Sequence, residues 1–367
     1  MQVEENPFEF GFEAQGDFPA DTVQEMPKVR QLLAGRNHLA LVSPRRFGKT
    51  GLVRKAVMET GRPAVFVNLQ MATTEAELAA MLLKAFLGIH PVGRFRADFK
   101  RFRAKPVLTY NIDTNAMEVS FDACVKGSAA LEDVLNVMDA HSDSDNRLIV
   151  VLDGCEEIPG LEPGTDKLLR AVMEKHANIN YVFIGSDEGA AALFEDDRTA
   201  FFHFGVLMRL SKIPHDAFSR FLVEKLKPIR GDKARDDAAE ILELAKGHAL
   251  FVQQLVTVFR EHCRLEGECA TVQGAGEALL RSLSASYEVL WSRLNRTNRR
   301  ILSVLARGGS LQDIGELSTS TVYGAVGRMR KDGLIVRDEE FALEDPFFEL
   351  WIRRSIEQAA TGVPGSP

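Results

Sequence analysis

The sequence is poor in cysteine and has no long apolar run. Its four cysteines are scattered, with no CxxC pair and no histidine at zinc spacing: Cys124, Cys155, Cys263 and Cys269. This pattern argues against a disulfide framework and a zinc site, and it favours buried free thiols in a reducing cytoplasm. No apolar stretch approaches the ~18 residues of a membrane helix, and the acidic start lacks a signal-peptide core. We therefore expect a cytoplasmic protein without a membrane segment.

Positive charge is not in excess either. The 367 residues carry a formal net charge of -7, with 26% charged and 45% hydrophobic residues. A chain of this charge is not a general nucleic-acid binder, so any such contact must come from a local basic patch. The length and the ordinary composition predict a soluble protein of two or three domains.

The stretch 38–59 has the layout of a phosphate-binding loop. Five mostly apolar residues at 38–42 are followed by Ser-Pro-Arg-Arg-Phe-Gly-Lys-Thr at 43–50 and then by a helical pattern. A strand, a short loop, Gly-Lys-Thr and a helix form a P-loop, in which backbone N–H groups and the helix N-terminus point at a phosphate. Lys49 would reach the β- and γ-phosphates of ATP, and the Thr50 hydroxyl would hold Mg²⁺.

One position departs from this motif. Ser43 stands where the motif has glycine, and it lacks the free φ of that residue, whereas Gly48, beside the lysine, is kept. The alternative is a helix N-terminus that carries Lys and Thr by chance. Because the motif lies between an apolar strand and an amphipathic helix, we favour a nucleotide site. Its predicted lining is Ser43, Pro44, Arg45, Arg46, Phe47, Gly48, Lys49, Thr50 and Gly51.

An acidic motif follows a buried strand predicted at 148–152. Asp153 ends this strand in the Walker B arrangement, where it would hold the water shell of Mg²⁺. Hydrolysis also needs a base or a group that orients the attacking water, and Glu156 and Glu157 lie just past the strand. A loop with Gly-Lys-Thr and a facing loop with Asp and Glu together give a stronger signal than either loop alone.

Three further residues are candidates for the nucleotide site, each with an alternative role. Ser186 follows a strand predicted at 181–184 and could sense the γ-phosphate or cap the next helix. Arg198 could act on phosphate charge in cis or across a subunit boundary, although we favour a pair with a neighbouring Asp. His248 begins a helix and could face the nucleotide, but a lone histidine is more often structural.

Alternating strands and helices at the start of the chain predict a doubly wound parallel sheet. We expect an α/β P-loop ATPase domain over residues 1–210, interrupted by an insert at 91–121. A helical lid at 211–283, a winged helix at 284–355 and a tail at 356–367 would follow. The composition around 266–276 also indicates a loose linker inside this helical part.

The insert combines a basic segment with a predicted hairpin. Residues 94–105 carry six Lys and Arg, and Phe95, Phe99 and Phe102 fall at i, i+4 and i+7, which predicts one helical face. The residues around 113–115 alternate as in a β-hairpin. The basic residues could contact nucleic-acid phosphate or another acidic partner. We favour the alternative, a solvated face on an amphipathic helix that is packed by its three Phe.

Three helices followed by a hairpin near the C-terminus predict the winged helix. Its third helix would read a DNA major groove and would expose Arg328, Arg330 and Lys331. The predicted wing is acidic, with Asp338 and Glu339 among its residues, which disfavours phosphate contact. Reading DNA and packing against protein both stay open for this element.

Together these pieces resemble the archaeal-type ATPases on the AAA+/STAND side of the P-loop NTPases. The resemblance covers about residues 6–355 and rests on "NPFEFG", "SPRRFGKT", the hairpin insert, "YVFIGS", "KGHALFVQQL" and "LIVRDEEFALEDPFFELWIRR". The acidic motif "VVLDGCEEI" is similar to the Asp-Gly-x-Asp-Glu pattern of NACHT-type members. By that match Asp153 is the Mg²⁺ residue, Glu157 is the catalytic glutamate and Glu156 replaces the preceding Asp.

The resemblance implies a parallel sheet with a central P-loop strand, a helical lid and a winged helix. The leading hypothesis is a slow Mg-ATP switch ATPase that binds ATP between the P-loop domain and the lid. Hydrolysis would reposition the lid and the winged helix toward a protein partner or an ATP-dependent oligomer. The alternatives are an ATP-regulated DNA-binding protein resembling archaeal origin-recognition initiators, and a non-catalytic nucleotide-binding scaffold.

Overall fold

The computed structural model describes most of the chain. The described ranges are 25–43, 47–111, 116–122, 126–186, 188–210, 213–315, 317–337 and 340–361. Several predictions lie outside these residues. They are the "NPFEFG" motif, Pro44, Arg45 and Arg46 of the phosphate loop, the hairpin turn at 113–115, and Asp338 and Glu339 of the wing.

The chain divides into two compact units. We call residues 25–43 with 52–210 the sheet unit, and the remaining residues, which include 44–51 and everything after 210, the helical unit. Helix α2 (Lys49–Thr60) begins in the short segment 44–51 and continues into the sheet unit. The division into three domains stays a prediction.

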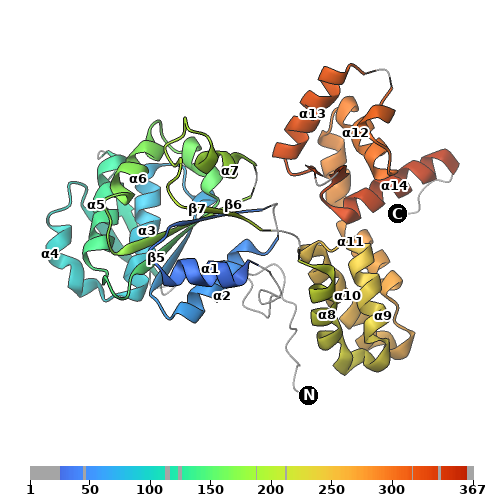
Figure 1. Ribbon diagram of the computed structural model, residues 1–367, viewed down its shortest axis with the longest axis horizontal. Coiled ribbons are helices and arrows are strands. Elements are labelled where there is room, and N and C mark those ends of the chain that lie inside the picture. The colour runs from blue at the N-terminus through green and yellow to red at the C-terminus, as the bar shows by residue number, and fades with distance from the viewer. Residues whose placement is uncertain are drawn as a thin grey trace. The chain divides into compact units, whose positions relative to one another are not determined.

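A five-stranded parallel sheet forms the centre of the sheet unit (Figure 1). Its strands are β1 (Leu39–Val42), β2 (Ala64–Asn68), β5 (Leu148–Asp153), β6 (Ile179–Gly185) and β7 (Val206–Arg209). They lie in the order β2-β5-β6-β1-β7, and all four neighbouring pairs are parallel. The predicted parallel sheet is confirmed, and the strand before the phosphate loop lies inside it.

Helices cover both faces of this sheet. They are α1 (Met26–Ala34), α2, α3 (Glu75–Ile89), α5 (Gly127–Ala140), α6 (Thr165–Met173) and α7 (Glu188–Glu195). Ala40 and Val42 of β1 belong to the core formed with α3, α5, α6 and α7. Leu39 and Leu41 are equally buried but lie outside that core, on the face covered by α1 and α2 (Figure 1). The alternation of side chains along β1 therefore gives each face its own apolar layer.

His38 holds the start of β1 in place. Its ring stacks on Phe204 with 4.5 Å between centroids, and its Nδ1 accepts a hydrogen bond from the Tyr181 N–H at 3.1 Å. Burial, helped by the charges of Arg147 and Arg170, lowers the pKa of His38 to about 4. The ring is therefore neutral at pH 7, which leaves Nδ1 free to accept this bond.

The insert contains the predicted hairpin but not the predicted single helix. Strands β3 (Pro106–Asn111) and β4 (Ala116–Phe121) pair antiparallel. The basic segment forms a short 3-10 helix, η3 (Val92–Phe95), and one turn of helix, α4 (Arg96–Phe99), after which the Arg101 N–H bonds to Asp98 O at 2.8 Å. Phe95 and Phe102 are buried from separate turns. Packing of the rings therefore overrides the helical spacing that the sequence shows.

The helical unit has one continuous core. Its elements are α8 (His215–Arg230), α9 (Ala234–Leu244), α10 (Ala249–Glu266), α11 (Val272–Arg293), α12 (Arg296–Ala306), α13 (Thr319–Lys331), β8 (Ile335–Arg337), β9 (Phe341–Leu343) and α14 (Pro346–Thr361). Buried residues from α8 through α14 belong to a single cluster. No helix in the described ranges combines the length and the apolar character that crossing a membrane requires.

Two local predictions for this unit are wrong. The expected linker at 266–276 is a short 3-10 helix followed by the start of α11, where Thr271 caps the helix by accepting from the Gly274 N–H at 3.0 Å. Its small residues are packing residues, since a Cβ on Gly276 would lie 3.5 Å from Leu244 Cδ1. The expected second helix of the C-terminal pattern is only the 3-10 turn η7 (Leu311–Asp313).

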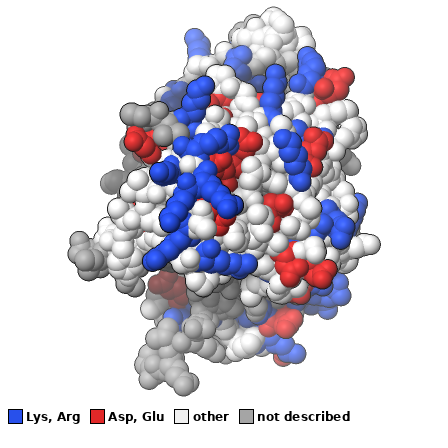
Figure 2. Space-filling view, turned by 90° about the vertical axis from the view of Figure 1, so that its left-hand side faces the viewer, with Lys and Arg blue, Asp and Glu red and all other residues white. Residues whose placement is uncertain are grey.

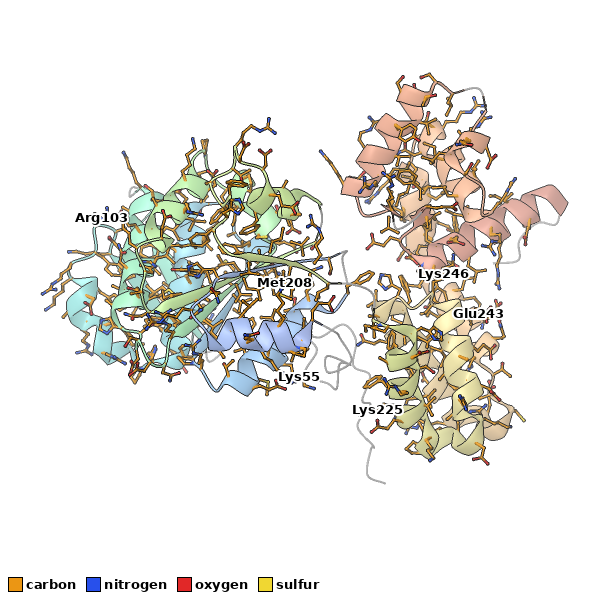
Figure 3. All side chains as sticks on the ribbon, viewed as in Figure 1. Lys55, Arg103, Met208, Lys225, Glu243 and Lys246 are labelled. Atoms are coloured by element: carbon orange, nitrogen blue, oxygen red, sulfur yellow. The ribbon has the colours of Figure 1, made fainter. Side chains whose placement is uncertain are left out.

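Contacts join α14 to the helices before α11. Lys246, labelled in Figure 3, donates from Nζ to both carboxylate oxygens of Glu349 at 2.7 and 2.6 Å. Phe251 of α10 meets Phe347 with 5.6 Å between ring centroids. The predicted lid and the predicted winged helix therefore share one core in this unit.

Candidate nucleotide site at the strand ends

The candidate site begins where β1 ends. The Ser43 N–H donates to Gly185 O at 3.4 Å, and Gly48 has a φ of 79°, which glycine adopts without strain. Helix α2 then begins at Lys49, with Thr50 next and no acidic residue in its first turn. The first N–H groups of a helix lack intrahelical partners and, with the helix dipole, favour an anion. This end of α2 therefore suits a phosphate group.

Strand register brings the acidic motif to the same edge of the sheet. Asp153 pairs with Ile184 of β6, and Gly185 of β6 pairs with Val42 at the end of β1. Because neighbouring strands lie about 4.8 Å apart, the ends of β5 and β1 are about 10 Å apart, with β6 between them. The chain leaves β1 for α2 on one face and β6 for α7 on the other. Ligands of parallel α/β sheets bind where loops diverge in this way.

Glu156 is the buried carboxylate of this edge. Neither of its carboxylate oxygens is exposed, and within the described part of the chain neither has a hydrogen-bond partner. A Cβ placed on Gly185 would lie 3.3 Å from Glu156 Oε2, so the carboxylate faces the end of β6. An ionised carboxylate without a partner is costly to bury. Its position fits a group that orients a water or contacts a bound ligand.

Glu157 differs from its neighbour. Gly154, with a φ of 79°, turns the chain into the 3-10 helix η4 (Cys155–Gly160), and the Glu157 N–H bonds to Gly154 O at 3.0 Å. Both side chains are half-buried as whole residues, but of the two only Glu156 has carboxylate oxygens that are fully buried without a hydrogen-bond partner in the described part of the chain. The motif match points to Glu157 as the catalytic glutamate, whereas the burial of the unpartnered carboxylate favours Glu156.

The protein groups available for Mg²⁺ are few. No group of three or more His, Cys, Asp or Glu side chains within the described ranges could hold a metal by itself. Mg²⁺ keeps several waters and is usually bound by one or two carboxylates together with substrate phosphates. Thr50 and Asp153, the two residues predicted from the sequence, have the oxygen ligands for that kind of site, and their role stays a prediction.

The three remaining candidates lie in different surroundings. Ser186 is half-buried directly after β6, at the same sheet edge as Asp153. The exposed Arg198 donates from Nε and Nη2 to Asp196 at 2.9 and 2.6 Å, which confirms the pairing favoured from sequence. That pair holds the pKa of Asp196 below its usual range. A role for Arg198 at a phosphate stays a prediction.

His248 is a buried residue of the helical unit. It precedes α10, and its ring meets Phe47 of the segment 44–51 at 5.1 Å and Phe251 at 5.0 Å between centroids. His248 is thus next to a residue of the phosphate loop, which supports its place among the candidates. These contacts are aromatic packing, and direct nucleotide contact stays a prediction.

Gly185 is a site residue that the sequence reasoning missed. A Cβ there would overlap with Ala190 Cβ and would lie 3.0 Å from Cys155 Sγ. Only glycine therefore lets α7 and the acidic loop approach the end of β6 together. The available signal was a glycine at the end of an apolar strand, which often marks a close backbone approach.

Comparisons with solved structures assign the fold. The chain is similar to the Walker-type ATPase of Pyrococcus abyssi, with a TM-score of 0.69 and 17% identity over 95% of this chain and 100% of that chain. It is also similar to the ADP form of the Aeropyrum pernix ORC2 protein, with a TM-score of 0.54 and 12% identity over 97% and 98%. For the Aeropyrum pernix ORC1 protein in complex with DNA, the values are 0.50 and 15% over 92% and 93%.

A scan of protein-family models and a search of curated proteins gave no match. At the identities above, structural similarity establishes the fold. The protein has the α/β fold of the P-loop NTPases, followed by a mainly helical C-terminal region, as predicted.

Proposed function

We propose that this protein is a Mg-ATP-dependent switch ATPase. The observation that carries the proposal is the carboxylate of Glu156, whose buried oxygens have no hydrogen-bond partner in the described ranges and lie beside the end of β6. Strand β6 lies between β1, which leads to Lys49, and β5, which ends at Asp153. A scaffold that only binds nucleotide has no need of such a group. The chemistry of ATP hydrolysis does, because the attacking water must be oriented and deprotonated.

Each residue of the proposed site has one task. Lys49 and the N–H groups of α2 hold the phosphates, and Thr50 and Asp153 bind Mg²⁺ and its waters. Bound Mg-ATP supplies the phosphoanhydride bond and neutralises part of the charge of the leaving group. Glu156 would orient the water and accept its proton, and Ser186, directly after β6, would sense the terminal phosphate.

The switch step rests on contacts inside the helical unit. Rings follow one another from Phe47 of the phosphate loop through His248 and Phe251 to Phe347 of α14. A change at the loop can therefore alter the packing of α10 and α14, which is a recurring form of nucleotide switching. A protein partner or an ATP-dependent oligomer would read that change.

Paired substitutions test this proposal. We expect Glu156→Gln to bind Mg-ATP with an affinity within about threefold of wild type and to lose roughly 100-fold or more in turnover. Glu157→Gln is the matched control and should keep both properties within about threefold. Calorimetric titration measures binding, and steady-state phosphate release measures turnover.

Two results would overturn the assignment. Loss of turnover only in Glu157→Gln would make Glu157 the base, as the motif match implies. Phosphate release by the wild type no greater than that of a Lys49→Ala variant would make the protein a non-catalytic scaffold.

A second candidate function is ATP-regulated DNA binding through α13. This helix exposes Arg328 and Lys331, leaves Arg330 half-buried, and is followed by the β8–β9 hairpin, in the order of a winged helix. The similar ORC1 structure contains DNA. Gel shifts of duplex DNA at low salt, with and without ATP, test this function, and the absence of any shift would remove it.

A further inference from the structure

The basic segment, residues 94–105, concentrates positive charge in an acidic protein. It has six basic residues and one acidic residue, in a chain of net charge -7. Five of the basic side chains are exposed and form no ion pair with any residue that the structure describes: Arg94, Arg96, Lys100, Arg101 and Lys105. The segment therefore presents cations without counter-ions of its own.

Aromatic rings fix this segment to the sheet unit. Phe95 is fully buried, with ring centroids 5.3 Å from Phe86 and 4.9 Å from His141, and Phe102 is only 6% exposed. The single acid, Asp98, lies 2.9 Å from His141 Nε2 through Oδ2 and so does not face the cations. The exposed charges thus stand on an ordered surface, which lowers the entropy cost of binding a partner.

Arg103 is the exception within the segment. Its guanidinium, labelled in Figure 3, donates to Asp133 at 2.9 and 2.7 Å and to Glu132 at 2.7 Å. These carboxylates raise the pKa of Arg103 above its usual value. Arg103 therefore attaches the segment to α5. It also provides an internal control, because its positive charge is neutralised by Asp133 and Glu132.

Figure 2 shows the side of the protein on which α4 lies, and Lys and Arg side chains gather there. Burial and then the charge of Arg94 lower the pKa of His90 beneath the segment. No large apolar side chain of the segment is exposed, and the next strand exposes Val107 (49%) and Tyr110 (61%). The surface is thus strongly basic, with one aromatic side chain at its border.

We propose that the basic segment binds the phosphate backbone of a nucleic acid. Protein–protein interfaces have an apolar core, which this surface lacks, whereas nucleic-acid interfaces are polar and positively charged. Five exposed cations lie within the twelve residues of the segment. A nucleic-acid strand offers several regularly spaced phosphates to such a cluster. The planar guanidinium groups match phosphate geometry, and Tyr110 can stack on a base.

This interface is separate from the two functions proposed above. It lies in the sheet unit, whereas α13 lies in the helical unit, and none of its residues belongs to the nucleotide site. Binding is therefore expected without ATP, and it should persist in a Lys49→Ala variant. Absence of ATP turnover would contradict the ATPase proposal, whereas absence of nucleic-acid binding would contradict this one. The two failures can therefore be told apart.

The test measures anisotropy of a labelled 30-nucleotide single strand and a labelled 30-bp duplex, titrated with the full-length protein over a range of KCl concentrations. The interface variant combines Arg94→Gln, Arg96→Gln and Arg101→Gln. We expect it to bind at least one of the two probes about tenfold or more weakly at low salt, and the salt slope to fall by about 2–3, since each phosphate contact contributes 0.7–0.9. The same positions changed to Lys should keep most of the affinity, because the charges remain.

Two controls separate this surface from others. Arg103→Gln should change affinity less than about threefold, and so should the combination of Arg328→Gln, Arg330→Gln and Lys331→Gln in α13. Thermal melting and basal ATP turnover of the interface variant should match the wild type, because its substituted side chains are exposed.

Four results would overturn the proposal. The first is that the wild type binds neither probe, and the second is that the interface variant binds as well as the wild type. The third is that only the α13 combination loses binding. The fourth is that poly-L-glutamate displaces the probe as effectively as unlabelled nucleic acid does. The last result would assign the segment to an acidic protein partner instead.

Discussion

Buried acids have partners in the helical unit, whereas a buried carboxylate at the strand ends of the sheet unit has none among the described residues. In the helical unit, Asp237 lies 2.6 Å from Arg230 Nε and is nearly buried with it, and the buried Glu349 is paired with Lys246. In the sheet unit, the buried carboxylate oxygens of Glu156 have no hydrogen-bond partner among the described residues. Paired buried charges hold a fold together only while both partners are present. An unpartnered carboxylate at the strand ends lowers stability unless a ligand or a water uses it.

This contrast applies to the strand ends and not to the whole sheet unit. Glu75 of the same unit is buried as well, but it accepts a hydrogen bond from Thr165 Oγ1 at 2.8 Å. That bond joins the start of α3 to the start of α6. In both units, buried acids that have partners therefore stabilise the fold. Glu156, whose buried oxygens have no partner among the described residues, lies instead at the candidate site.

The largest effect is expected from removing the phosphate-binding charge. Lys49→Ala should weaken Mg-ATP binding beyond the range of a calorimetric titration, because Lys49 is the group that meets the β- and γ-phosphates in a P-loop. Lys28→Ala is the matched control, since Lys28 is exposed on α1, and it should bind as the wild type does. If Lys49→Ala bound Mg-ATP with unchanged affinity, the proposed nucleotide site would be wrong. The carboxylate of Glu156 would then have no ligand to explain its lack of a partner among the described residues.

An intermediate effect is expected on stability and tests the contrast directly. Asp237→Asn breaks the buried ion pair with Arg230, and breaking a buried pair by removing one partner should cost roughly 3–5 kcal/mol. Glu156→Gln removes an uncompensated carboxylate, so unfolding should need the same or a higher urea concentration. Urea unfolding of both variants measures the difference. Similar destabilisation by the two substitutions would show that Glu156 is structural.

The smallest effect is expected at the exposed pair of Arg198 and Asp196. Arg198→Ala should leave the melting temperature unchanged and ATP turnover within about twofold, because exposed ion pairs contribute little. Arg209→Ala, which breaks the exposed pair with Glu195, is the control. A loss of turnover of tenfold or more in Arg198→Ala alone would place Arg198 at the nucleotide, in cis or across a subunit boundary.

Much of the fold could be read along the chain because its signals are local. Buried strands such as 148–153 appear as short apolar runs, and α13 shows the inward spacing of Val322, Val326 and Met329 together with its Ser318 cap. The segments that failed depend on distant partners. The region around Gly276 has the composition of a linker, yet it packs against Leu244.

The amino-acid sequence by itself determined the chemical parts of the site. Gly-Lys-Thr after one apolar run and Asp with two Glu after another are local patterns, since each follows from residues adjacent in the chain. Tertiary structure decided how these parts meet. It inserted β6 between β5 and β1, required Gly185 where α7 and the acidic loop converge, and buried the carboxylate of Glu156 beside it. Burial depends on which segments pack together across the sheet, and spacing along the chain does not contain that information.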